Sequence, residues 1–170
     1  MDKSVLYQMA YGMYVVSSVK GAEYNGQIAN TVFQISSDPA TIAISINKQN
    51  LTHDYISASK VFTVSILEKE APLKCIGLFG FKSGKDVKKF ESSPFKIGIT
   101  GAPIALENAL SYLEAEVVQT VDVETHSVFI GKIIAGEHLK SGEPMTYAYY
   151  HEVKKGLTPK TAPTYIKKEE

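Results

Sequence analysis

The chain has 170 residues, of which 44% are hydrophobic and 21% charged, and its 18 acidic residues balance 18 basic ones. These values predict one folded domain with a substantial core and exclude a disordered chain. Without net positive charge a nucleic-acid partner is not expected. Every basic residue is lysine, so a bound phosphate would have to rely on amides, hydroxyls and ammonium groups.

A single cysteine, Cys75, excludes an internal disulfide or a multi-cysteine metal site within one chain, and its apolar neighbours suggest a small core residue. His53, His138 and His151 are too scattered to predict a metal site. The N-terminus has no signal-peptide pattern and no apolar run is long enough for a bilayer, so we expect a cytoplasmic protein with no membrane partner.

In chain order, residues 4–10 predict a short helix. Residues 11–48 are β-branched and aromatic and predict three consecutive antiparallel strands, with Lys20-Gly21 and Asn25-Gly26 as turn signals. Polar caps before apolar residues predict a helix from Asn50 to about Ser59. Alternation over residues 61–67 predicts a further strand.

Pro72 is suited to begin a helix that runs through Phe79, and the lysine-rich residues 83–90 predict a loop with a helical turn. Residues 112–118 alternate, which places both glutamates, Glu114 and Glu116, on a solvated face. Residues 128–134 predict a strand in which Gly131 marks a bulge or a tight approach. The fold class is therefore mainly β, a β-barrel with α additions, with a domain over 1–153 and an extended tail over 154–170 that contains no evident packed element.

The stretch from Gly26 to Val32 is the most informative segment. Its small and hydroxyl-bearing residues would let backbone amides approach an anion, which suggests a cradle for a phosphorylated cofactor. A hairpin turn entering a strand is an equally good interpretation, because Asn-Gly is a common turn dipeptide.

The order of four segments favours the cofactor cradle over the hairpin turn. These segments are 11–16 (YGMYVV), 26–34 (GQIANTVFQ), 45–48 (SINK) with Thr52-His53, and 125–131 (THSVFIG). Together they resemble the flavin reductase family, and within it the ferric reductase and flavoredoxin-like subgroup. The similarity runs from Tyr7 to about Tyr165. It implies an FMN-binding split barrel, an antiparallel Greek-key-like barrel with short helices, that forms a homodimer, binds FMN and uses NADH or NADPH.

The resemblance also implies which residues bind the cofactor. Around the flavin edge and phosphate it places Gln27, Ile28, Ala29, Asn30 and Thr31; along the isoalloxazine it places Ser45, Ile46, Asn47 and Lys48. Thr52 and His53 would approach the phosphate from a helix N-terminus. Close relatives can carry cysteine where this chain has Ser45, so a thiol role does not transfer. Lys82 is a further candidate for a phosphate, with a solvated charged loop as the alternative.

His126 is the candidate catalytic residue. A lone histidine at a strand entrance is more often structural or exposed, but the resemblance implies that it stabilises reduced FMN or positions the nicotinamide. Three tyrosines near the C-terminus could pack at a dimer interface or cover the flavin, and the dimer interface is the favoured interpretation; they are Tyr147, Tyr149 and Tyr150.

The resemblance implies an FMN-dependent NAD(P)H oxidoreductase: hydride passes from the nicotinamide nucleotide to bound FMN, and electrons then pass to a ferric chelate, free flavin or a small rubredoxin-like protein. The alternative is an FMN-containing electron carrier that a protein partner reduces. A flavin-free binding barrel is a third possibility, and the fold alone does not decide among these functions.

Overall fold

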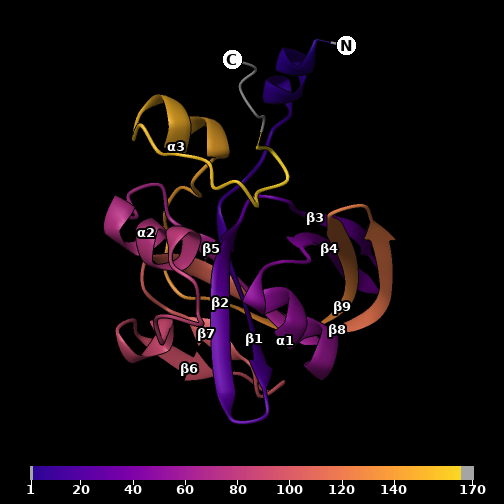
Figure 1. Ribbon diagram of the computed structural model, residues 1–170. Coiled ribbons are helices and arrows are strands. Elements are labelled where there is room, and N and C mark those ends of the chain that lie inside the picture. Colours follow the sequence, from indigo (N-terminus) through magenta and orange to yellow (C-terminus); the bar gives the residue numbers. More distant parts are fainter. Residues whose placement is uncertain (1, 166–170) are drawn as a thin grey trace.

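The computed structural model describes residues 2–165, which form a barrel-like sheet with short helices around it (Figure 1). The sheet has seven strands in the order β2-β1-β5-β8-β9-β4-β3, and each neighbouring pair is antiparallel. Its strands are β1 (Tyr14–Lys20), β2 (Glu23–Ala29), β3 (Val32–Ser37), β4 (Ala40–Asn47), β5 (Val61–Leu67), β8 (Ala109–Val123) and β9 (His126–His138). Within the described residues the border strands β2 and β3 do not pair with each other, so the barrel is split between them. The mainly β prediction is confirmed.

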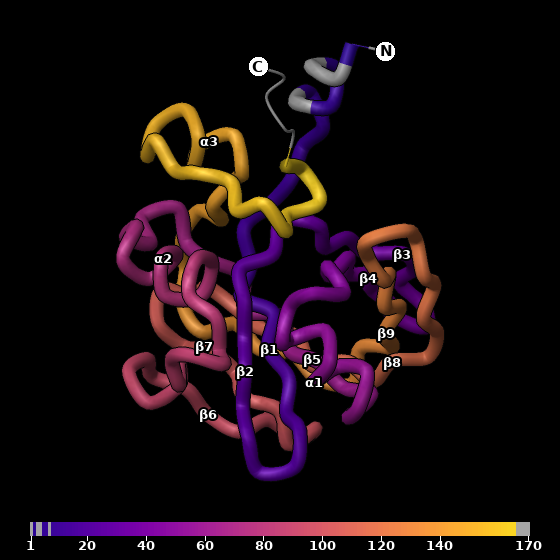
Figure 2. Tube along the Cα trace, in the orientation of Figure 1, coloured from indigo at the N-terminus to yellow at the C-terminus, as the bar shows by residue number. Residues whose placement is uncertain are grey.

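The remaining elements are short: a 3₁₀ turn at Lys3–Gln8, helices α1 (Leu51–Ser59), α2 (Leu73–Phe81) and α3 (Tyr147–Glu152), a 3₁₀ turn at Lys89–Glu91, and a hairpin of β6 (Phe95–Ile97) and β7 (Pro103–Ala105). None of the helices over residues 2–165 is both long and apolar enough to cross a bilayer. Figure 2 shows α3 and the yellow C-terminal segment together at one end of the barrel, away from the β1–β2 hairpin tip.

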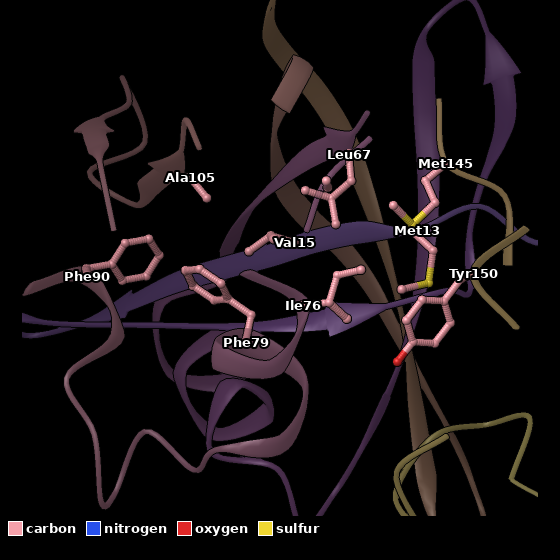
Figure 3. Packing of buried hydrophobic residues seen from close by; sticks show 10 residues of the cluster. Met13, Val15, Leu67, Ile76, Phe79, Phe90, Ala105, Met145 and Tyr150 are labelled. Atoms are coloured by element: carbon pink, nitrogen blue, oxygen red, sulfur yellow. The ribbon is translucent and has the colours of Figure 1, made fainter. Parts of the chain in front are cut away.

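Two apolar clusters form the core. One fills the barrel and includes Ile44, Phe62 and Phe129. The other joins the sheet to α2 and α3; in Figure 3 Met13, Ile76 and Tyr150 gather at one end of it and Phe79 and Phe90 at the other. Burying large apolar side chains of this kind contributes about 1.5–3 kcal/mol for each of them.

Gly131 lies in the first cluster. A Cβ atom there would lie 2.7 Å from the Phe62 ring and 2.9 Å from the Ala115 Cβ, so the predicted tight approach is confirmed. The helix predicted from Asn50 to about Ser59 is confirmed as α1, and the strand predicted over residues 61–67 is confirmed as β5.

The prediction of three strands over residues 11–48 is wrong, because this region contains four. Asn25-Gly26 is not a turn: Gly26 pairs with Ser17 in the middle of the β1–β2 ladder, and the chain reverses at Gly21, whose φ is +60°. Gly26 is needed for packing instead, since a Cβ there would lie 2.7 Å from the Ser17 hydroxyl and 3.2 Å from the Phe90 ring.

The solvated position predicted for Glu114 is also wrong. Its side chain is 1% exposed, and its carboxylate accepts hydrogen bonds from the N–H groups of Ile99 and Thr100 and from the Thr100 hydroxyl. A register shift in the β8–β9 pairing between Glu114 and Ala115 breaks the simple alternation of this strand. Glu116, beyond the shift, is exposed as predicted.

Helix α3 (Tyr147–Glu152) precedes the predicted tail and was not foreseen. Within the tail, residues 154–165 contain no helix or strand, but hydrogen bonds tie Leu157 to Tyr150 and Thr164 to Asn30. Residues 166–170 of the predicted tail, like Met1, lie outside the described residues.

Candidate functional site

A cavity of about 510 Å³ lies where the split barrel is open, between β2 and β4. The start of α1, the C-terminal end of α2, helix α3 and the C-terminal segment complete its wall. Its lining comes mainly from residues 27–30, Ser45 and Asn47, residues 49–52, residues 79–84, Lys89, Tyr147, Tyr150 and residues 157–163.

One end of the cavity carries a buried cation, Lys89. Its side chain is 4% exposed, and its ammonium donates hydrogen bonds to the carbonyl oxygens of Gly26 (2.8 Å) and Phe79 (3.2 Å). Among the described residues no carboxylate forms an ion pair with it. Burial lowers the pKa of Lys89 to about 8, because the charged form has lost its hydration. A buried ammonium with only neutral partners is suited to receive an anion.

Polar groups from three other elements surround this cationic end. The Asn25 amide donates a hydrogen bond to the Thr52 hydroxyl (2.9 Å), and Thr52 lies in the first turn of α1, where backbone N–H groups favour an anion. Gly84 approaches the Asn25 side chain so closely that a Cβ atom would overlap it. Lys82, at the C-terminal end of α2, is exposed at the mouth.

The opposite end is crossed by residues 157–164, which we term the C-terminal strap. There the Asn30 amide donates to the Thr164 hydroxyl (2.9 Å), which donates to the Tyr147 hydroxyl (2.9 Å). The Tyr147 and Thr158 hydroxyls lie 2.7 Å apart. Since a strand rises about 3.3 Å per residue, Asn25 and Asn30 place the two ends of the cavity roughly 16 Å apart.

Between the two ends lies Gln27, whose side-chain oxygen is buried and has no hydrogen-bond partner within residues 2–165. Its amide nitrogen reaches the Ile28 carbonyl only at 3.4 Å. An unpaired buried carbonyl that faces a cavity is a ready acceptor for a ligand N–H group.

His126 is the first residue of β9 and lines a second cavity, of about 590 Å³. The two cavities share Ser45, Asn47 and Gln49 as well as residues 160–163 of the strap. His126 Nε2 donates to the Thr161 carbonyl of the strap (3.3 Å), which leaves Nδ1 to accept from the Thr125 hydroxyl (2.8 Å). Partial burial lowers the pKa of His126, and the hydrogen bond to Thr161 opposes that effect in part, so the ring is neutral at pH 7.

The structure divides the residues predicted to bind the cofactor into two groups. The first cavity is lined by Gln27, Ile28, Ala29, Asn30, Ser45, Asn47, Thr52 and Lys82. Neither cavity is lined by Thr31, Ile46, Lys48 or His53. Thr31 donates to the Asn30 side-chain oxygen, and Ile46 is fully buried in the barrel core.

Lys48 and His53 belong to a separate polar network behind the cavity. Ser127 donates to the Asp122 carboxylate (2.6 Å) and so accepts from His53 Nε2 (2.8 Å), while the Lys48 ammonium lies 3.5 Å from the same carboxylate. The His53 ring packs against Phe129. This network fixes the β8–β9 turn that positions His126. No group of three or more metal-ligating side chains is gathered anywhere in residues 2–165.

Sequence reasoning missed Lys89 and the strap, and it ranked the cavity position of Tyr147 and Tyr150 second. Lys89 is one of four lysines between residues 82 and 89, and nothing local separates it from its solvated neighbours. Tyr147 and Tyr150 line the cavity of their own chain, and Tyr150 is 3% exposed, which fits the alternative interpretation better than the favoured dimer interface. A tyrosine spacing of i and i+3 was the available signal, because it places both rings on one helix face.

The family model for the flavin reductase like domain matches residues 6–158. The chain is 54% identical over 165 residues to the high molecular weight rubredoxin of Moorella thermoacetica, covering 97% of this chain and 72% of that protein. It is 45% identical over 166 residues to a ferric-chelate reductase (NAD(P)H) of Archaeoglobus fulgidus, covering 98% of each. Among solved structures, the NADH:FAD oxidoreductase SgcE6 of Streptomyces globisporus superposes with a TM-score of 0.77 at 25% identity, covering 85% of this chain and 86% of that one.

Proposed function

The chain belongs to the flavin reductase-like family of oxidoreductases, and we propose that it is an FMN-dependent NAD(P)H oxidoreductase. The observation that carries this proposal is the cavity itself. A buried cation at one end, an unpaired amide oxygen in the middle and aromatic side chains at the other end match the phosphate, the imide and the ring of a flavin mononucleotide.

Each end of the cavity has a separate task in this proposal. Lys89, Thr52 and the N-terminus of α1 would hold the phosphate, with the Asn25 amide orienting the Thr52 hydroxyl. Gln27 would accept a hydrogen bond from the ring imide. A bound flavin would supply a ring that takes up a hydride from NADH or NADPH and releases electrons singly or in pairs.

His126 would act on the nicotinamide side. Its neutral ring presents one N–H group at Nε2, because Nδ1 is occupied by the Thr125 hydroxyl. A fixed donor of this kind can orient a carboxamide or stabilise developing negative charge. The partial burial of His126 limits competing hydrogen bonds from water.

The electron acceptor is proposed as a ferric chelate, free flavin or a rubredoxin-like protein. The A. fulgidus relative is named a ferric-chelate reductase and the M. thermoacetica relative a high molecular weight rubredoxin, which supports the first and third of these. One nicotinamide nucleotide supplies two electrons, so its oxidation would balance two ferric ions or one free flavin.

A spectroscopic titration tests the proposal. The purified protein is loaded with FMN, freed of unbound flavin and mixed anaerobically with NADH or NADPH. We expect the flavin absorbance near its visible maximum to bleach with either or both nucleotides and to return when a ferric chelate is added. A yellow protein that neither nucleotide bleaches would favour an electron carrier, and a protein that takes up no flavin would refute the proposal outright.

We also propose a homodimer, formed through the outer face of β3, β4, β9 and β8. Cross-strand pairs link Phe33 to Ala43 and Val128 to Val121, and alternate residues along each strand share that face. Its exposed apolar side chains are Phe33, Ile35, Val121 and Val123, each more than 40% exposed. An apolar face of this extent is typical of an interaction surface. Sedimentation of Val121→Glu should then show a monomer, whereas Ile99→Glu, at an exposed residue off this face, should leave the dimer intact.

A further inference from the structure

The C-terminal strap separates the two cavities. Its residues 160–163 line both cavities. Both cavities are also lined by Ser45, Asn47 and Gln49. The strap therefore lies between the second cavity, which His126 lines, and the end of the first cavity where the flavin ring is proposed to bind.

The strap is held mainly by hydrogen bonds. The His151 Nδ1 donates to the Gly156 carbonyl (2.8 Å), so His151 Nε2 accepts from the Thr158 hydroxyl (3.2 Å). Thr158 in turn accepts from Tyr147, which accepts from Thr164. With the Asn30 amide as first donor, these bonds form one directed chain in which each hydroxyl donates once and accepts once, an arrangement that strengthens each bond in it.

Little else holds this segment in place. No residue between 157 and 165 is buried, and Leu157 is 72% exposed. The segment has no helix or strand of its own. Few buried apolar contacts and exposed hydrogen bonds characterise the parts of a protein that open most readily.

We propose that the strap is a displaceable barrier that a nicotinamide nucleotide must move before it can react, an inference that rests on the proposed function. Hydride transfer requires the donor carbon to approach the acceptor to about 3–3.5 Å, which leaves no space for a chain segment between them. The Thr161 carbonyl also occupies the N–H group of His126, which the nucleotide would need. The nucleotide therefore binds the open form of the strap, and its apparent affinity is reduced by the fraction of molecules that are closed.

The variant Thr158→Val tests this inference, because valine keeps the shape of threonine but breaks the directed chain at its centre. Two part-exposed hydrogen bonds are lost, and at a strength in the lower half of the usual range their loss raises the open fraction about tenfold. The matched control is Thr120→Val, at an exposed position on β8 outside both cavities.

Hydrogen–deuterium exchange of the peptide that covers residues 157–164 reports the strap directly, without any measurement of activity. In FMN-loaded protein we expect exchange to be about tenfold faster in Thr158→Val than in the wild type or in Thr120→Val. We also expect saturating nicotinamide nucleotide to speed exchange in the wild type, and Thr158→Val to bind the nucleotide up to tenfold more tightly.

Two results would overturn the inference: wild-type exchange in Thr158→Val, or a nucleotide that slows exchange of the strap. Failure of the proposed function is distinguishable from these outcomes, since it appears as an absence of flavin uptake or of bleaching in every variant. If a nucleotide bleaches the flavin while the strap keeps its slow exchange, the proposed function stands and the barrier does not.

Discussion

Replacing Lys89 by methionine is the sharpest test of the cofactor site, because it removes the buried positive charge and largely preserves the side-chain volume. A hydrogen bond to a charged group contributes about 1.5–3 kcal/mol, so we expect Lys89→Met to weaken FMN binding roughly 10- to 150-fold. Riboflavin, which has the same ring and no phosphate, should bind the wild type and the variant equally well.

Fluorescence titration of the apoprotein with the two flavins measures both affinities. Lys82→Met is the control, since its ammonium is exposed and an exposed ion pair contributes only about 0.2–1 kcal/mol, at most a fivefold effect. If Lys89→Met weakened both flavins equally, or neither, the assignment of the phosphate to this end of the cavity would be refuted.

The same residue predicts a pH dependence of stability. The pKa of Lys89 is about 8 in the folded protein and near its ordinary value of 10.5 when unfolded. Between these values the unfolded chain binds more protons than the folded one, so Lys89 makes the free energy of unfolding rise from pH 8 to pH 10.5. The shift corresponds to about 3 kcal/mol. Urea titrations should show this rise as a difference between the wild type and Lys89→Met in the absence of flavin, and FMN affinity should fall over the same range. Parallel pH profiles of the two proteins would contradict the low pKa.

Three further substitutions test other parts of the structure. Glu114→Ala should lower the free energy of unfolding by about 3 kcal/mol, because it leaves buried N–H groups without acceptors, whereas Glu116→Ala should change it by less than about 0.5 kcal/mol in a denaturant titration. Gly131→Ala should cost about 1–3 kcal/mol through overpacking against the Phe62 ring, seen as a lower melting temperature, while Gly77→Ala on α2, with no atom near the added methyl, should be neutral or stabilising. His126→Ala should retain FMN affinity and slow its reduction by nicotinamide in stopped-flow measurements about 10²-fold; an unchanged rate with normal nucleotide affinity would remove this residue from the site.

The sequence predicted those elements whose cause is local. The helix at α1 has polar residues before an apolar face, and β5 alternates strictly, so both were located from the chain alone. The prediction failed where distant residues decide the structure. Strand position 26 is a glycine because Ser17 and Phe90 leave no room for a Cβ, and Glu114 is buried because a loop 15 residues earlier supplies its donors.

The candidate site likewise contains residues that the sequence indicated and residues whose role depends on distant contacts. The resemblance drew attention to residues 27–30, Ser45, Asn47 and Thr52, all of which line one cavity. Burial separates Lys89 from the other lysines, and burial depends on where α2 and the following loop lie against β2. The strap could not be inferred because its place over the cavity depends on a contact between residues more than 100 positions apart, Asn30 and Thr164.

The hydrogen bond from Lys89 to Gly26 also bears on aggregation. A border strand exposes unpaired backbone groups to which a stray chain can add, and proteins often block this with a charged side chain. On β2 the buried ammonium occupies a carbonyl of that border, so no foreign strand can pair there without first displacing it. The other border strand, β3, carries the exposed Phe33 and Ile35 instead. Chains that associate wrongly would therefore be expected to do so through β3.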